Sequence, residues 1–104
     1  MPDLLSTATA VVISAGLVYP ADDLRARVER SPKAVAAFVE RRAMCNHFLG
    51  EEPYDEKRAA FLNRTIRELR CARLERDERR LRGTFRDRPA VLALLDETAE
   101  SLGW

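Results

Sequence analysis

The segment "SPKAVAAFVERRAMCNHFLG", residues 31–50, decides the fold class. It begins with a strong helix-start signal, because Ser31 can serve as N-cap and Pro32 suits the first helical position. Gly50 supplies a stop. One sector of the helix gathers Val35, Phe38, Val39, Arg42, Cys45, Asn46 and Leu49. Ala37, Met44 and Phe48 make the opposite side apolar as well, so we expect this helix to be central.

The segments on either side also have helical patterns, and no stretch alternates with a period of two for long. Asp22 or Asp23 can cap a short helix that carries Leu24 and Val28 on one side. A last helix should start near Pro89 and shows Val91, Leu95 and Leu102 at helical spacing.

Between these helices, Asp55 is the expected cap of a segment whose apolar pattern breaks. The first stripe is Ala59, Leu62, Ile66 and Leu69, and the second is Leu74, Leu81 and Phe85. The five-residue step from Leu69 to Leu74 fits no helical spacing, so we infer a kink or stop close to Arg70–Cys71. The sequence therefore predicts an all-α protein, a small bundle of about four helices, with residues 22–104 as one domain.

The N-terminus adds an uncharged segment, Leu4 to Tyr19, which is too short for a comfortable membrane span. It has the length of a signal-peptide core, although no Lys or Arg precedes it. Residues 1–21 are therefore interpreted as a signal peptide or, alternatively, as an N-terminal apolar helix. We favour export to a periplasmic or secreted location in a bacterium, with a cytoplasmic location as the alternative and no stable membrane span.

The two cysteines, Cys45 and Cys71, fit an exported chain with one disulfide, whereas in the cytosol they would be two buried thiols. A simple hairpin turning at Glu52 would leave them about 18 Å apart, far beyond the roughly 7 Å that a disulfide tolerates between Cα atoms. Either the bond is absent, or residues 50–56 run extended and bring the second helix back past the first. We prefer the second arrangement because the pattern already breaks at Cys71.

Polar side chains at the end of the central helix form the candidate binding or structural cluster. Its members are Arg42, Asn46, His47, Glu51, Glu52 and Asp55. A buried Arg42 needs an acceptor, and the carboxylates of the following turn are nearest in sequence. His47 and Glu51, four residues apart, could pair at the helix end.

The residues of this cluster do not form a pattern typical of a catalytic or metal-binding site. Cys45 and His47 point roughly 200° apart on a helix, and no other histidine exists. The chain also lacks the C-x-x-C or H-x-x-x-H pairs of zinc sites. We therefore expect no catalytic residue, no metal and no cofactor.

Arginine recurs every third residue from Arg64 to Arg82, which makes the series wind around a helix rather than form one stripe. Residues 64–88 hold ten arginines and five acids, a local excess that could meet an acidic partner. No aromatic platform interleaves these charges, so nucleic acid is not expected, and a net charge of +1 gives no further reason for it.

The stretch "CNHFLGEEPYDEKR", with "LRC" at 69–71 and "PAVLALL" at 89–95, resembles a group of small, exported, uncharacterised bacterial helical proteins. The resemblance rests on the Cys-Asn-His-Phe-x-Gly-Glu motif and a second cysteine, and covers roughly residues 36–96. It implies export and a Cys45–Cys71 disulfide, and it implies no activity.

The sequence thus favours a non-catalytic, exported binding or inhibitor-like protein whose partner is another protein, met through the arginine-rich helical surface. One alternative is a small metal-binding protein or enzyme that uses Cys45, His47 and Glu51. Another is a cytosolic protein-interaction module with reduced thiols. The identity of the partner and the oligomeric state stay open.

Overall fold

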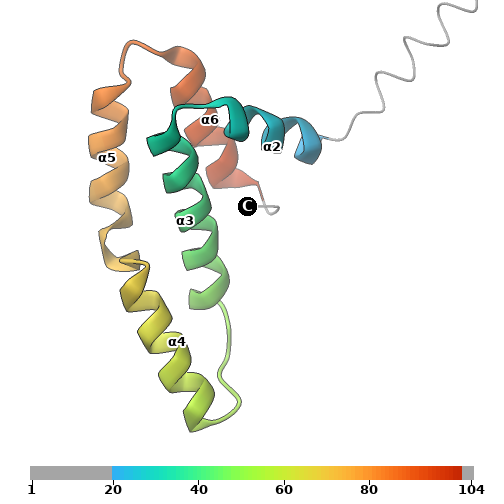
Figure 1. The fold of residues 1–104 in the computed structure, drawn as a ribbon, viewed down its shortest axis with the longest axis vertical. Coiled ribbons are helices and arrows are strands. Elements are labelled where there is room, and N and C mark those ends of the chain that lie inside the picture. The colour runs from blue at the N-terminus through green and yellow to red at the C-terminus, as the bar shows by residue number, and fades with distance from the viewer. Residues whose placement is uncertain (1–19, 102–104) are drawn as a thin grey trace, which may run out of the picture.

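The computed structural model describes residues 20–101, and the regular secondary structure in that range is helical throughout. The helices are α2 (Pro20–Arg30), α3 (Lys33–Leu49), α4 (Glu56–Glu68), α5 (Leu74–Thr84) and α6 (Pro89–Glu100), with a 3-10 turn, η1 (Cys71–Arg73), between α4 and α5 (Figure 1). The predicted all-α fold with one disulfide is confirmed. These residues form five helices instead of about four, because the break near Arg70 separates α4 from α5 completely. The apolar segment Leu4–Tyr19 and Leu102 lie outside the described residues.

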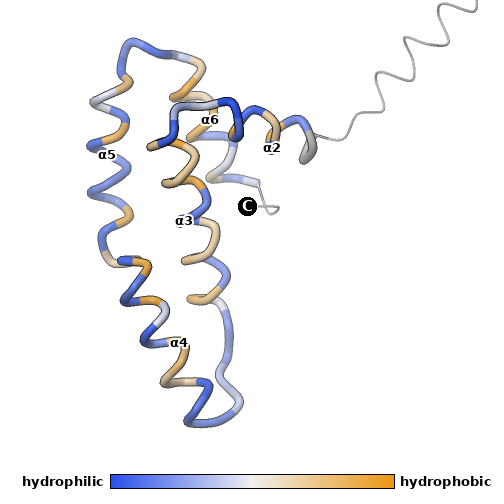
Figure 2. The backbone as a smooth tube through the Cα atoms, viewed as in Figure 1, coloured by the Kyte–Doolittle hydropathy of each residue, from blue (hydrophilic) through white to orange (hydrophobic). Residues whose placement is uncertain are grey.

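Helix α3 is the centre of the fold, as predicted, because it contacts α2, α4, α5 and α6. Figure 2 shows longer apolar runs along α3 and α6, whereas α4 and α5 are mostly hydrophilic. The buried core consists of Leu24, Val28, Val35, Phe38, Val39, Val91, Leu94 and Leu95. Helix α5 adds only partly buried side chains to this core, and α4 adds none. The main core thus lies among α2, α3 and α6, and α4 lies outside it.

The start signals in the sequence located two helices correctly and misplaced two others. Asp55 caps α4 by accepting a 2.7 Å hydrogen bond from the Arg58 amide, and Pro89 begins α6. Ser31, however, donates its hydroxyl to the Val28 carbonyl at 2.6 Å, so it closes α2 and does not cap α3. Asp22 and Asp23, the expected caps of α2, lie inside the helical range Pro20–Arg30, so neither is its N-cap.

The end of α3 is at Leu49, with Gly50 after it as predicted. Gly50 adopts an ordinary right-handed conformation (φ −88°), and its amide donates to the Asn46 carbonyl. A Cβ at this position would lie 3.3 Å from that same carbonyl oxygen. The glycine therefore serves to keep space beside the last turn of α3, and no left-handed turn requires it.

The predicted break between α4 and α5 occurs at Arg70, which has a left-handed backbone (φ 56°, ψ 46°). Beyond α3 the chain continues away from the core before it turns at Tyr54–Asp55, and α4 then runs back beside this non-helical segment toward the end of α3 (Figure 1). Residues 51–55 are not helical, and this is the arrangement that a Cys45–Cys71 disulfide requires. It brings the end of α4 level with the last turns of α3.

Candidate functional site

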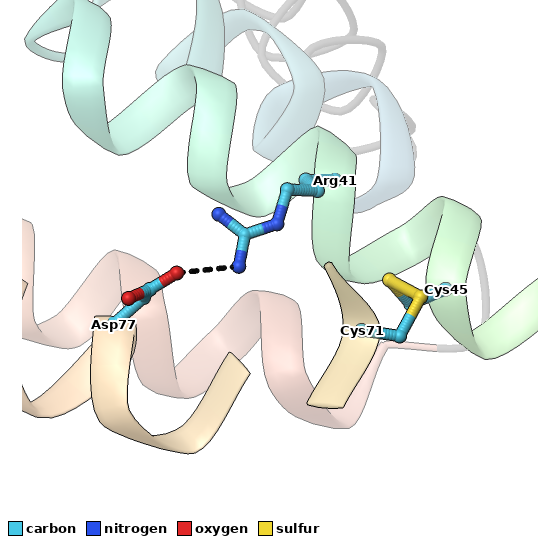
Figure 3. The surroundings of a disulfide bond; sticks show 4 residues. All are labelled: Arg41, Cys45, Cys71 and Asp77. Carbon is cyan, nitrogen blue, oxygen red and sulfur yellow. Dashed lines mark hydrogen bonds and ion pairs between the residues drawn. A yellow bond between two sulfur atoms is a disulfide. The ribbon is translucent and has the colours of Figure 1, made fainter. Parts of the chain in front are cut away.

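The disulfide joins Cys45 of α3 to Cys71 of η1 and fixes how α4 and α5 lie on α3 (Figure 3). The two Cα atoms are 5.6 Å apart, and both side chains are buried. Because the left-handed Arg70 directly precedes Cys71, the bond holds the chain where its direction changes. The pairing expected from the sequence is confirmed.

The polar cluster expected at the end of α3 does not form one site. Arg42 is buried and points toward α5 and α6, while Asn46, His47, Glu52 and Asp55 are exposed. Asn46 and Leu49 belong to the same helical sector as the buried residues, yet both face solvent. The reason is that α2 and α6 cover only the N-terminal part of this sector, and α3 extends beyond them (Figure 1).

The acceptors of Arg42 come from distant parts of the chain, so the expectation that its own turn would supply them is wrong. Its guanidinium donates to the Leu95 carbonyl at 3.0 Å and to the Thr98 hydroxyl at 2.8 Å on α6. It also reaches Glu78 of α5 at 3.2 Å. Burial, partly offset by Glu78, lowers the pKa of Arg42 from its ordinary value. Arg42 therefore connects three helices.

Glu78 continues this network toward the surface. It accepts two hydrogen bonds from Arg82, which also contacts Asp96 of α6 at 2.7 Å. The run from Arg42 through Glu78 and Arg82 to Asp96 thus ties α5 to α3 and α6. These side chains therefore hold the three helices together.

The turn after α3 is tied by Arg58, and the expected pair of His47 and Glu51 does not form. Arg58 donates to the two carboxylate oxygens of Glu51 at 2.6 and 2.8 Å. This hydrogen bonding lowers the pKa of Glu51, and the nearby His47 adds a smaller effect. The exposed His47 ring lies edge-on against Phe48, with ring centroids 4.9 Å apart.

These contacts bear on the alternative of an enzyme or metal protein built on Cys45, His47 and Glu51. With its sulfur in the disulfide, Cys45 offers neither a nucleophile nor a metal ligand. Glu51 is engaged by Arg58. Among the residues that the structure describes, no three His, Cys, Asp or Glu side chains gather as a metal site would require.

A groove of about 500 Å³ runs between α3 and α5, and we call it the α3–α5 groove. Its apolar surface comes from Phe38 on α3 and from Leu81 and Phe85 at the other wall. Ala34 and Ala37 also face it. These short side chains leave the space open, since a larger residue at either position would extend toward α5. The volume is in the range of ordinary ligand pockets.

The polar rim of the α3–α5 groove is strongly basic. Four arginines line it (Arg41, Arg70, Arg73 and Arg80) with one acid, Asp77. Asp77 is bonded to Arg41 at 2.7 Å, which lowers the pKa of Asp77 (Figure 3). Among the side chains that the structure describes, no carboxylate lies within ion-pair distance of the other three arginines. The rim therefore carries a charge of +3, from four cations and one anion.

Two of the rim arginines, Arg41 and Arg70, have energetically unfavourable local geometry. The Arg41 Nε is buried and has no hydrogen-bond partner in the described part of the chain. Arg70 holds a left-handed backbone conformation that costs a residue with a Cβ roughly 1–2 kcal/mol. Unfavourable local geometry of this kind is concentrated at binding sites in proteins, where the surrounding structure maintains it.

The arginine excess is visible in the sequence, but the groove is not. The pattern located the charges on a helical surface and gave no way to know that α5 packs beside Ala34 and Ala37. The signal that could have identified it is the pair of small residues on a central helix, opposite a basic helix.

No helix of residues 20–101 is long and apolar enough to cross a membrane. Comparisons with protein-family models, with curated proteins and with solved structures found no match for this chain.

Proposed function

We propose that this chain is a non-catalytic binding protein that holds an acidic segment of a protein partner in the α3–α5 groove. The observation that supports this most is the rim charge of +3 around an apolar floor. An acidic segment with one apolar or aromatic residue would satisfy both parts of this surface. Inhibition of the partner would be one consequence of such binding.

The length of the groove suits a short peptide. Its α5 wall spans eleven residues, which is about 16 Å of helix. Roughly five residues of extended chain cover the same distance. A segment of this size can meet several rim arginines while one side chain lies against the partly exposed Leu81 and Phe85.

The aromatic residues of the groove argue against nucleic acid. Phe38 is 4% exposed and Phe85 is only partly exposed, so the groove offers no row of open aromatic faces on which successive bases could stack. Stacking on such faces is what single-strand-binding proteins add to their basic surfaces. Binding of a protein carboxylate does not require an exposed aromatic ring, because arginine side chains alone can recognise it.

The disulfide supports the second part of the proposal, which is an exported location. Structural disulfides persist in oxidising compartments and are rare in the cytosol. The resemblance to small exported bacterial proteins points the same way. We therefore place the binding reaction in a bacterial envelope or in the medium.

Binding can be tested by fluorescence anisotropy with a labelled peptide that has four glutamates around one tyrosine. The double variant Arg73→Gln/Arg80→Gln should weaken binding about tenfold, because two rim charges are lost. A matched control is Arg79→Gln/Arg86→Gln, which removes two exposed arginines that do not line the groove. Equal losses in the two double variants would contradict a role for the groove.

Two further probes separate the proposed partner from other anions. A peptide with glutamine in place of glutamate should not bind. Vesicles containing phosphatidylglycerol should not show a dependence on the groove arginines. If the vesicles bind through these arginines and the acidic peptide does not, the partner is a lipid surface and the proposal is wrong.

Export can be tested by the intact mass of the chain expressed in a bacterium with its own N-terminus. We expect a shortened chain that is two hydrogens lighter than the reduced form and takes up alkyl groups only after reduction. A full-length chain alkylated at Cys45 and Cys71 without reduction would instead support the cytosolic interaction module.

A further inference from the structure

The turn between α3 and α4 forms an acidic tip, residues 51–56, with the sequence "EEPYDE". Tyr54 lies at its bend and is 78% exposed, the largest exposure among the exposed large apolar side chains of the described residues. Glu52 and Glu56 are exposed. Among the residues that the structure describes, no Lys, Arg or His lies within ion-pair distance of Glu52 or Glu56. The tip therefore presents free carboxylates around an aromatic ring.

The acidic tip has the chemistry that the α3–α5 groove would recognise. Its four carboxylates less the one paired with Arg58 leave a charge of −3, against +3 on the groove rim. The phenol ring of Tyr54 can enter an apolar groove and can also lie against a guanidinium. The same kind of contact exists within the chain, where Arg58 lies 4.7 Å from the ring centre of Phe61.

The tip cannot reach the groove of its own chain. Helix α4 lies between them, and its thirteen residues are about 20 Å long. Figure 1 shows the tip at the end of the hairpin of α3 and α4, away from the upper part of α5. The disulfide fixes the far end of this hairpin at Cys45. Contact between tip and groove therefore requires two molecules.

We propose that the acidic tip of one copy of this chain docks in the α3–α5 groove of a second copy. The inference rests on the proposed function of the groove as a site for an acidic segment, and it names a second copy as one partner. If two copies exchange tips reciprocally, the assembly closes as a dimer; if the contact is one-sided, it adds further copies. In both cases the tip would compete with other acidic partners for the groove.

Charge exchange between the two surfaces tests the proposal on the full, disulfide-bonded chain. In the groove variant, Arg73→Glu/Arg80→Glu makes the rim acidic. In the tip variant, Glu52→Lys/Glu56→Lys makes the tip basic. Each variant alone should weaken self-association about tenfold or more, because its tip and its groove then carry the same sign. Mixing the two variants should restore association, since each tip then meets a groove of opposite sign.

Sedimentation velocity over a range of protein concentrations measures this association, and circular dichroism checks that each variant is folded. The wild-type association should also weaken as salt is raised. A wild-type chain that is monomeric up to millimolar concentration would overturn the inference. Association that persists in both variants would also overturn it, and would direct attention to the exposed Met44 and Phe61.

The same variants keep this inference separate from the proposed function. If the chain stays monomeric but the labelled acidic peptide still binds and depends on Arg73 and Arg80, the groove binds acidic segments of other proteins only. If the peptide does not bind, the proposed function fails as well. If association occurs, unlabelled acidic peptide should dissociate the assembly.

Discussion

Arg41 and Arg42 are neighbours on α3 that both bond to carboxylates of α5, yet their removal should have very different effects on stability. The Arg42 side chain is 10% exposed, whereas the side chains of Arg41 and its partner Asp77 are both 25% exposed and so partly open to solvent. An exposed ion pair contributes about 0.2–1 kcal/mol, while breaking a buried one by removing a partner costs about 3–5 kcal/mol. Comparing the two alanine variants therefore separates the effect of burial on stability from the effect of having an ion pair.

The expected magnitude for Arg42→Ala is about 3 kcal/mol. The lost contacts are three hydrogen bonds from a buried cation and the packing of its stem, with the guanidinium 5.1 Å from the centre of the Phe38 ring. We take the low end of the range of about 3–5 kcal/mol because the groups that lose Arg42 still have other hydrogen-bond partners. Glu78 still accepts from Arg82, and the Thr98 hydroxyl still donates to the Leu94 carbonyl. Arg41→Ala should cost less than about 1 kcal/mol.

A third variant, Arg42→Met, separates charge from packing. Methionine retains much of the stem and adapts to irregular space, so it should lose about half as much as alanine. Urea unfolding followed by far-ultraviolet circular dichroism measures the three variants. A domain of this size has roughly 4–12 kcal/mol of stability, so each variant should remain measurably folded. Equal losses for Arg41→Ala and Arg42→Ala would refute the reasoning.

Three other perturbations should have measurable effects on stability. Reduction, or the double variant Cys45→Ala/Cys71→Ala, should lower the unfolding free energy by roughly 3.5 kcal/mol, and an unchanged urea midpoint would contradict this. Arg70→Gly should raise the melting temperature by a few degrees, because glycine adopts the left-handed conformation without the Cβ clash and returns about 0.5 kcal/mol. Hydrogen bonds from arginine partners hold the pKa values of Glu51 and Asp77 below 4.5 and 3.8, so the folded chain binds fewer protons there than the unfolded chain. The urea midpoint should therefore be level above about pH 5.5 and should fall as the pH drops below 4, and the variant Glu51→Gln/Asp77→Asn should reduce that fall.

The helices themselves could be predicted because their signals are local. The extent of α3 follows from its apolar side chains and Gly50, and Asp55 and Pro89 mark helix starts within a few residues of sequence. The prediction for Ser31 is wrong because its hydroxyl can serve either the end of one helix or the start of the next. The local signal alone does not choose between them.

The partners of buried charges could not be predicted, because they are distant in the sequence. Arg42 finds Glu78 after 36 residues and Thr98 after 56. The carboxylates nearest to Arg42 in the sequence are those of the turn after α3, whereas the fold supplies acceptors from α5 and α6. The α3–α5 groove is subject to the same limit, since it exists only once α5 lies beside Ala34 and Ala37.

The disulfide also sets the length of the hairpin that α4 forms with α3. One helical turn added to α4 alone would move Cys71 about 6 Å along the axis. With its Cα already 5.6 Å from that of Cys45, the separation would exceed what a disulfide spans. The two limbs of the hairpin can therefore grow or shrink only together, by matching additions on either side of Tyr54. A chain that keeps this bond can alter how far its acidic tip projects only in such paired steps.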